Sequence, residues 1–192
     1  MQGGYIVNLD GRRFGDESAG YSEFAAILNS QEGNTGWLII DKRIHDGSMS
    51  FKEFEVTAAS GAIIWADTME EIASKTSLPV ENLLAEFENA KAVNAGVSED
   101  KLGRKIFEKP LAAPFGAIRL RPSLFHTQGG VRVDKDARVL KEDGAAIAGL
   151  YAAGGAALGI SGNGSDGYLA GNGLLAAVGF AYLAAKSIAE SP

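Results

Sequence analysis

Short apolar runs alternate with amphipathic stripes over the first hundred residues, which predicts a mixture of strands and helices. The apolar runs at 5–9, 37–40 and 63–65 are too short for helices and are typical of buried strands. Helical spacing of apolar residues predicts one helix at 21–28 and another from Val80 to just before Gly96. Between them, Thr68 and Glu71 form a capping-box pattern, which predicts a helix that ends near Ser77.

The pattern changes beyond Lys109, where three prolines punctuate the chain within a short distance. This change predicts a domain boundary near residue 105. Alternating residues at 117–121 indicate a strand, and 130–134 with 137–140 indicate a hairpin. A further strand is expected at 150–153. The last segment, from Asn172 to about Ala189, is apolar almost all round, which predicts a buried helix.

Composition narrows the class of protein. The chain has 192 residues, 46% of them hydrophobic and 22% charged, as in an ordinary soluble globular protein. A formal net charge of −6 has the wrong sign for a nucleic-acid partner. The chain has no cysteine and only two histidines far apart, so no metal site is expected. Without a signal-peptide pattern or a long apolar run, we expect a cytoplasmic protein with no membrane span.

Glycine is concentrated in the last third of the chain, where eleven of the 25 glycines lie between Gly144 and Gly179. Residues 162–167 match the GxGxxG pattern of dinucleotide-binding folds, but they neither follow a strand directly nor open a helix. A glycine-rich surface loop is the structural alternative. The start of the last helix, Gly171-Asn172-Gly173-Leu174-Leu175, offers a second interpretation, because backbone donors at a helix N-terminus suit an anion or a ring carbonyl.

Several blocks in order resemble the fumarate reductase, succinate dehydrogenase flavoprotein and 3-ketosteroid dehydrogenase family. The blocks are Asp10-Gly11-Arg12-Arg13-Phe14-Gly15-Asp16-Glu17, Pro114-Phe115-Gly116-Ala117, His126-Thr127-Gln128-Gly129-Gly130-Val131, Gly149-Leu150-Tyr151-Ala152-Ala153-Gly154 and Gly171-Asn172-Gly173-Leu174. The resemblance implies an α+β fold with a cap (substrate) domain of mixed strands and helices at 1–105. Residues 106–192 would then be the C-terminal segment of a Rossmann-like FAD-binding domain whose N-terminal Rossmann unit is absent.

The same resemblance implies site residues. The catalytic candidates are Tyr21, His126 and Tyr168. The FAD-binding candidates are Gly154, Gly155, Gly171, Asn172, Gly173, Leu174 and Leu175. Fumarate reductases have arginines where this chain has Tyr21 and Tyr168, and steroid dehydrogenases have a tyrosine where it has Gly116. The expected substrate is therefore a small, less polar enone, ketone or carboxylate.

Two functional hypotheses follow. The first is a piece of an FAD-dependent oxidoreductase that moves a hydride between flavin N5 and an activated C–C bond, with the isolated chain inactive. The second is a flavin-free binding or assembly module on the same scaffold. In either case the apolar residues at 174–183 would lack part of their packing partner, so self-association is expected.

Two further features have structural alternatives. Tyr21 as a proton donor competes with an aromatic residue on the packed face of a short helix. Asp16 and Glu17 are expected to form exposed ion pairs with Arg12 or Arg13, and exposed pairs contribute little stability.

Overall fold

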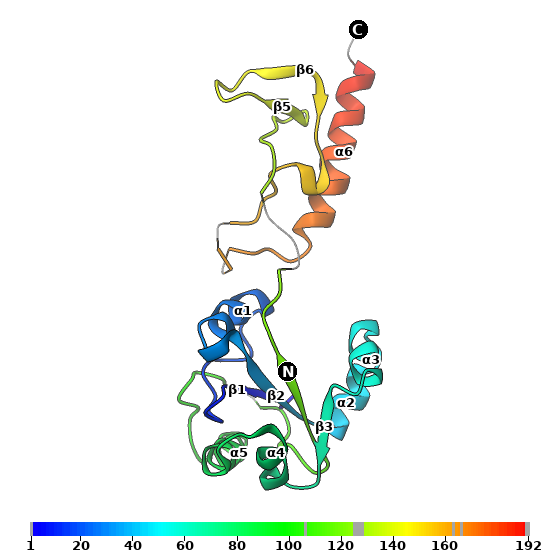
Figure 1. Cartoon of the computed structure of the whole chain (residues 1–192). Helices are drawn as coiled ribbons and strands as arrows, with labels where there is room; N and C mark the ends of the chain where they lie inside the picture. The colour runs from blue at the N-terminus through cyan, green and yellow to red at the C-terminus, as the bar shows by residue number, and fades with distance from the viewer. Residues whose placement is uncertain (1, 106, 125–128, 163, 166, 191–192) are drawn as a thin grey trace. The chain divides into compact units, whose positions relative to one another are not determined.

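The chain forms two compact units of mixed helices and strands, Met1–Ser123 (unit 1) and Leu124–Pro192 (unit 2). The computed structural model describes residues 2–105, 107–124, 129–162, 164–165 and 167–190 (Figure 1). The mixed helix and strand content confirms the expected class. The boundary between the two units follows Ser123, later in the sequence than residue 105, because the strand at 115–120 pairs inside unit 1. The assignment of 1–105 and 106–192 to two flavoprotein domains stays a prediction.

Unit 1 is built around a four-stranded sheet in the order β1-β2-β4-β3, and all neighbours are antiparallel. The register places Trp37 opposite Arg119 and Ile63 opposite Ile118. The central strand β4 thus joins segments that lie far apart in the sequence. The strands are β1 (Tyr5–Val7), β2 (Gly36–Asp41), β3 (Ile63–Ala66) and β4 (Phe115–Leu120).

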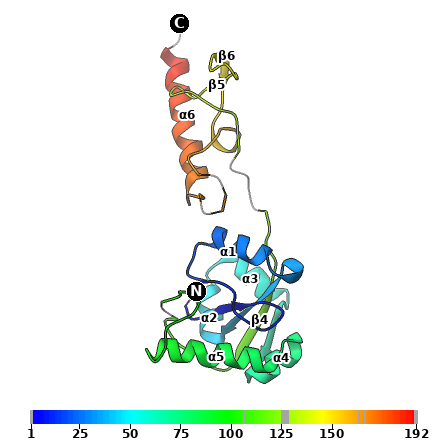
Figure 2. The same ribbon diagram turned by 90° about the vertical axis from the view of Figure 1, so that its left-hand side faces the viewer.

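Five α-helices and one 3₁₀ turn accompany the sheet in the described part of unit 1. They are α1 (Tyr21–Asn29), the turn η1 (Glu32–Asn34), α2 (Lys42–Ser48), α3 (Lys52–Ala59), α4 (Met69–Thr76) and α5 (Val80–Asn94). Figures 1 and 2 show α4 and α5 together on one side of the sheet and α1 on the other. Helices α2 and α3 were not predicted, because their apolar stripes are short. The buried residue of α2 is Ile44, and α3 has only the half-buried Phe54 and Ala58 packed against the core.

The capping box before α4 is confirmed. The Thr68 hydroxyl accepts a hydrogen bond from the Glu71 backbone N–H at 3.1 Å, and the Glu71 carboxylate accepts from the Asp67 N–H at 3.1 Å. The first bond satisfies a backbone donor that the first helical turn leaves unpaired, and the second holds the residue before the N-cap against the helix. The local sequence therefore determines where this helix begins.

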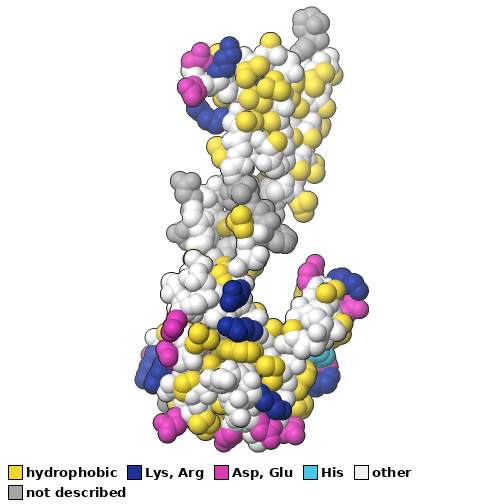
Figure 3. Space-filling model, viewed as in Figure 1, with side chains coloured by type: hydrophobic (Ala, Val, Ile, Leu, Met, Phe, Trp, Pro, Cys, Tyr) yellow, Lys and Arg dark blue, Asp and Glu magenta, His cyan; other side chains and the backbone are white. Residues whose placement is uncertain are grey.

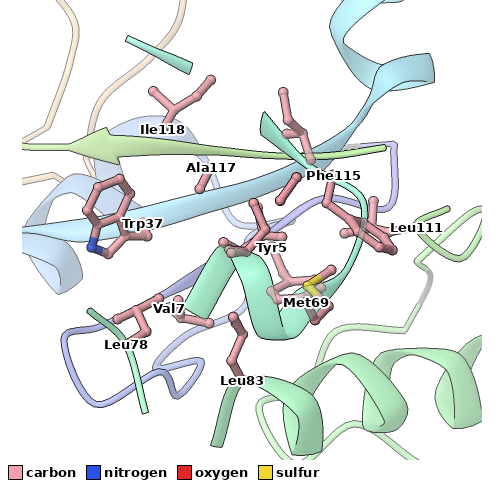
Figure 4. Close-up of a cluster of buried hydrophobic side chains, with 14 of the residues drawn as sticks. Tyr5, Val7, Trp37, Met69, Leu78, Leu83, Leu111, Phe115, Ala117 and Ile118 are labelled. Atoms are coloured by element: carbon pink, nitrogen blue, oxygen red, sulfur yellow. The ribbon is translucent and has the colours of Figure 1, made fainter. Parts of the chain in front are cut away.

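The core of unit 1 lies between the sheet and the pair α4 and α5 (Figure 4). Tyr5, Ile39, Ile72 and Leu83 are fully buried there. Burial of such side chains stabilises the fold by about 1.5–3 kcal/mol each. The strand residues and the helix stripes predicted from the sequence meet in this one cluster.

Tyr5 is an exception within that core, because its buried hydroxyl has no hydrogen-bond partner among the described residues. We expect Tyr5→Phe to raise the free energy of unfolding by up to about 1 kcal/mol, since it removes an unsatisfied buried polar group. Burial raises the pKa of the Tyr5 phenol well above its ordinary value of 10.0. Above pH 10 the Tyr5 phenol should ionise in the unfolded chain but not in the folded one. The free energy of unfolding of the wild type should therefore fall there, and Tyr5→Phe should lack this loss. Urea unfolding of both proteins at pH 8 and pH 11 measures both effects. Equal free energies of unfolding for wild type and Tyr5→Phe at both pH values would contradict them.

Unit 2 contains a two-stranded sheet, a 3₁₀ turn and one long helix. These are β5 (Arg138–Leu140), β6 (Ala146–Tyr151), η2 (Gly154–Ala156) and α6 (Asn172–Glu190). The predicted hairpin between 130–134 and 137–140 is confirmed in part. Val133 bridges Val139, the Asp134 N–H donates to the Arg138 carbonyl at 3.0 Å, and the Leu140 N–H donates to the Arg132 carbonyl at 2.9 Å. The sequence analysis did not predict that β5 also pairs with β6. Val131 bonds through its N–H to Ala156 and through its carbonyl to Leu158, both at 2.9 Å.

The predicted burial of α6 is also wrong within this chain. Only Asn172 and Ala176 are buried among its described residues, whereas Leu174, Val178 and Tyr182 are 77%, 72% and 68% exposed. Figure 3 shows hydrophobic side chains along this helix. By length and composition α6 is the one described helix that could cross a membrane, but a core helix of a soluble protein passes the same test. Self-association through this face stays a prediction, which light scattering tests; a monodisperse monomer would contradict it.

Candidate functional site

The start of α6 and the glycine-rich loops before it surround a cavity of about 330 Å³ in unit 2. Six of the seven residues predicted to bind the cofactor line it, together with Tyr168. The full lining is Gly129, Gly154, Gly155, Ala157, Gly159, Tyr168, Gly171, Asn172, Gly173, Leu174 and Ala176. The seventh residue, Leu175, lines a separate small apolar hollow of about 130 Å³ beside Ile160 and Phe180.

Bare backbone forms much of this cavity wall. A methyl group added at Gly129, Gly155, Gly171 or Gly173 would meet no atom within 4 Å. The first turn of α6 adds backbone donors and the positive end of the helix dipole. Ligand cavities commonly measure about 300–1,000 Å³. The cavity therefore fits a flat, polar-edged ring such as the flavin of FAD, although it is too small for the whole dinucleotide.

Asn172 has a structural role beside its predicted contact with the cofactor. Its side-chain oxygen accepts a hydrogen bond from the Ile160 backbone N–H at 2.8 Å, and the residue is only 5% exposed. Gly159 leaves room for this amide, because a methyl group there would lie 2.6 Å from the Asn172 side chain. Asn172 thus connects the start of α6 to the loop on the opposite wall.

A second cluster, in unit 1, surrounds the Arg13 and Glu17 of the Asp10–Glu17 block. Arg13 donates to Glu17 at 2.7 and 2.8 Å and to Asp100 at 2.6 Å, and Arg104 donates to Glu17 at 3.1 Å. All four side chains are at most 2% exposed. We call these four residues the ion cluster. Burial alone would lower the pKa of Arg13, but its hydrogen bonds to the two carboxylates outweigh burial and raise the pKa.

The ion cluster partly corrects the sequence analysis. The pairing of Glu17 with Arg13 is confirmed, but its expected exposure is wrong. The Asp16 carboxylate accepts instead from the backbone N–H and hydroxyl of Ser18, at 2.8 and 2.5 Å. Sequence reasoning missed Asp100 and Arg104, because they lie in a polar loop with no pattern that links them to residues 13 and 17.

An aromatic ring completes the ion cluster. The guanidinium carbons of Arg13 and Arg104 lie 4.7 and 4.1 Å from the centroid of the Phe107 ring. Cation–π contacts of this kind attract the guanidinium groups to the face of the ring. The Glu17 carboxylate also accepts a hydrogen bond from the Ile6 backbone N–H at 3.0 Å, which connects the ion cluster to β1.

Two of the three predicted catalytic residues lie among the described residues, one in each unit. Tyr21 is the first residue of α1 in unit 1 and is 71% exposed, so it is not on the packed face of that helix. It lines a cavity of about 610 Å³ in unit 1. Tyr168 lies in the glycine-lined cavity of unit 2. His126 lies outside the described residues.

Comparison with known proteins identifies the family. Residues 1–174 match the family model described as "FAD binding domain". The chain belongs to the FAD binding domain family. The cofactor of this family is FAD, and the resemblance seen in the sequence is therefore confirmed.

Members of the FAD binding domain family that resemble this chain are oxidoreductases. This chain is 36% identical to an NADH:acrylate oxidoreductase of Vibrio harveyi, and the match covers 78% of this chain and 15% of that protein. It is 31% identical to a 3-oxosteroid 1-dehydrogenase of Mycobacterium tuberculosis, with 98% of this chain and 39% of that protein covered. The solved structure of a flavocytochrome c3 fumarate reductase in an open conformation matches with a TM-score of 0.72 and 26% identity, over 98% of this chain and 32% of that one. The chain thus spans less than two fifths of each.

Proposed function

We propose that this chain forms the cap and part of the flavin site of an FAD-dependent oxidoreductase acting on a C–C bond next to a carbonyl or carboxylate group. The observation that carries the proposal is the glycine-lined cavity at the start of α6, in a chain of the FAD binding domain family. The names of the relatives support the reaction class, since acrylate, fumarate and 3-oxosteroids all carry such a group. A cytoplasmic location is part of the same proposal.

The residues of unit 2 would hold the flavin ring. Gly155 and Gly173 leave space for a flat group against the backbone, and the first amides of α6 face a developing negative charge favourably. Bound FAD would supply hydride transfer at its N5 atom. Asn172 keeps the wall in place through its bond to Ile160.

Tyrosines would handle the proton and the substrate carbonyl. A phenol can donate or accept a hydrogen bond at neutral pH, whereas an arginine is a permanent cation. With Tyr21 and Tyr168 at the two positions where the resemblance places arginines in fumarate reductases, these two positions supply no guanidinium fork for a dicarboxylate. We propose Tyr21, Tyr168 and His126 as the residues that exchange the proton or hold the substrate.

A flavin-binding titration tests the cofactor site. Riboflavin carries the ring without the adenosine, so it matches the size of the cavity. We expect riboflavin fluorescence to be quenched on binding to the chain and Gly173→Trp to abolish the quenching, since the indole would occupy the cavity. Ala181→Trp is the matched control, because Ala181 is exposed farther along α6 and does not line the cavity.

The opposite result would favour the flavin-free binding module. In that case wild-type protein and Gly173→Trp would give the same riboflavin fluorescence. An absorption spectrum after incubation with FAD and desalting provides a second measurement, and retained flavin bands would support the oxidoreductase.

A further inference from the structure

We propose that the cavity of unit 1 beside α1 binds the apolar body of a monocarboxylate, and that Arg121 binds its carboxylate. The cavity measures about 610 Å³ and lies wholly within unit 1. The inference rests on the proposed function only in naming this ligand as the substrate. Binding itself requires no flavin.

The wall of this cavity is mainly apolar. Phe24 and Leu28 of α1 contribute one side, and Ile6 of β1 and Leu120 of β4 contribute another. Phe24, Leu28 and Ile6 are at most 7% exposed, so the wall is part of a packed structure. Such a surface favours a ring or branched chain over a polar ligand, because a polar group placed against it would lose its hydration.

Two charged side chains line the cavity, Glu17 and Arg121, and they differ in how many partners they already have. Glu17 lines it, but this carboxylate already accepts four hydrogen bonds, from Arg13, Arg104 and the Ile6 N–H. Arg121 also lines it, and among the described residues no carboxylate forms an ion pair with Arg121. The net attraction at the rim is therefore for an anion.

Arg119, which lies within β4, differs from Arg121 in having partners in unit 1. Arg119 donates to the Thr35 hydroxyl at 3.3 Å and lies 6.0 Å from the centroid of Trp37. Arg121 follows the end of β4, where it is exposed at the cavity rim. A guanidinium in that place binds a carboxylate through two parallel hydrogen bonds.

One available cation and a large apolar wall determine the ligand class. A second carboxylate on this wall would meet mainly apolar side chains and the Glu17 carboxylate, with the neutral hydroxyls of Ser18, Tyr21 and Ser123 in place of a second cation, which costs desolvation and repulsion. A volume of 610 Å³ lies well within the range of small-molecule sites and leaves room for a ring. The ligand is thus a monocarboxylate with a ring-sized apolar body.

The test is an NMR titration of the ¹⁵N-labelled chain with cyclohexanecarboxylate, cyclohexylmethanol and fumarate as probes. We expect saturable shifts at the Ala25 and Leu28 amides with cyclohexanecarboxylate and weaker binding of the other two. Arg121→Gln should weaken the affinity for cyclohexanecarboxylate about tenfold, the effect expected from loss of one charge-assisted hydrogen bond. Arg132→Gln is its control, since Arg132 is an exposed arginine of unit 2.

A pair of substitutions on α1 tests the place of binding. Ala25→Phe should abolish the shifts because it fills the cavity, whereas Ala26→Phe, at the exposed neighbouring position, should leave them unchanged. Equal affinity for the alcohol, equal affinity for fumarate, or no effect of Arg121→Gln would overturn the proposal. The riboflavin titration runs on the same samples, so a failure here with flavin still bound would leave the oxidoreductase assignment standing.

Discussion

Replacing Glu17 by alanine is expected to lower the free energy of unfolding of unit 1 by about 3–5 kcal/mol. The substitution removes the buried carboxylate that both Arg13 and Arg104 contact, and it removes the acceptor of the Ile6 N–H. A buried charge without full compensation is far more costly than the loss of an exposed pair. Urea unfolding followed by tryptophan fluorescence measures the effect, because Trp37 and Trp65 both lie in unit 1.

Asp16→Asn is the matched control for Glu17→Ala. Asp16 contacts only Ser18 in the hydrogen bonds given above, and an asparagine oxygen can accept the same bonds. We expect this change to stay within about 0.5 kcal/mol of wild type. A loss below about 1 kcal/mol for Glu17→Ala would show that the ion cluster is solvated rather than buried.

Replacing Gly130 by alanine is expected to disrupt the loop pairing beside the glycine-lined cavity. The new methyl carbon would lie 2.4 Å from the backbone carbonyl carbon of Ala157 and 2.6 Å from the Leu158 nitrogen. Backbone atoms cannot rotate away as a side chain can, so the two segments must separate. We expect unit 2 to lose about 1–3 kcal/mol, together with the bonds of Val131 to Ala156 and Leu158.

Hydrogen exchange at the Val131 and Leu158 amides measures this loss. Their protection should fall by about tenfold to a hundredfold in Gly130→Ala. Gly129→Ala is the control, since a methyl group there meets no atom within 4 Å and the change in the unfolded chain is the same. Equal protection in the two variants would mean that residues 130 and 157 do not approach as closely as the structure shows.

The ion cluster gives the Arg-Phe-x-x-Glu part of the family block a physical meaning. Glu17 connects β1, through the Ile6 N–H, to Arg13 and to the distant Arg104. Four residues after Glu17, α1 begins at Tyr21. The block thus connects the residues just before α1, the helix that carries a proposed catalytic residue, to β1 and to Arg104.

The sequence by itself determined the elements that local physics controls. The apolar runs of β1, β2 and β3 and the stripe of α5 were predicted from spacing, and Thr68 with Glu71 determined the start of α4. The glycine-rich start of α6 was also recognised as a candidate binding site, and the structure collects most of those residues around one cavity. Helix α3 was not predicted in this way, because its periodic signal is short: Phe54 and Ala58 are half-buried against the core and none of its residues is fully buried.

Only the tertiary structure decided which distant segments meet. It buried Arg13 and Glu17 by bringing Asp100 and Arg104 to them, paired Val131 with Ala157, and left α6 exposed. These outcomes depend on contacts between residues far apart in the chain. Local propensity and hydrophobic period carry no information about such contacts, since they describe a residue's near neighbours and not the surface that folding places against it.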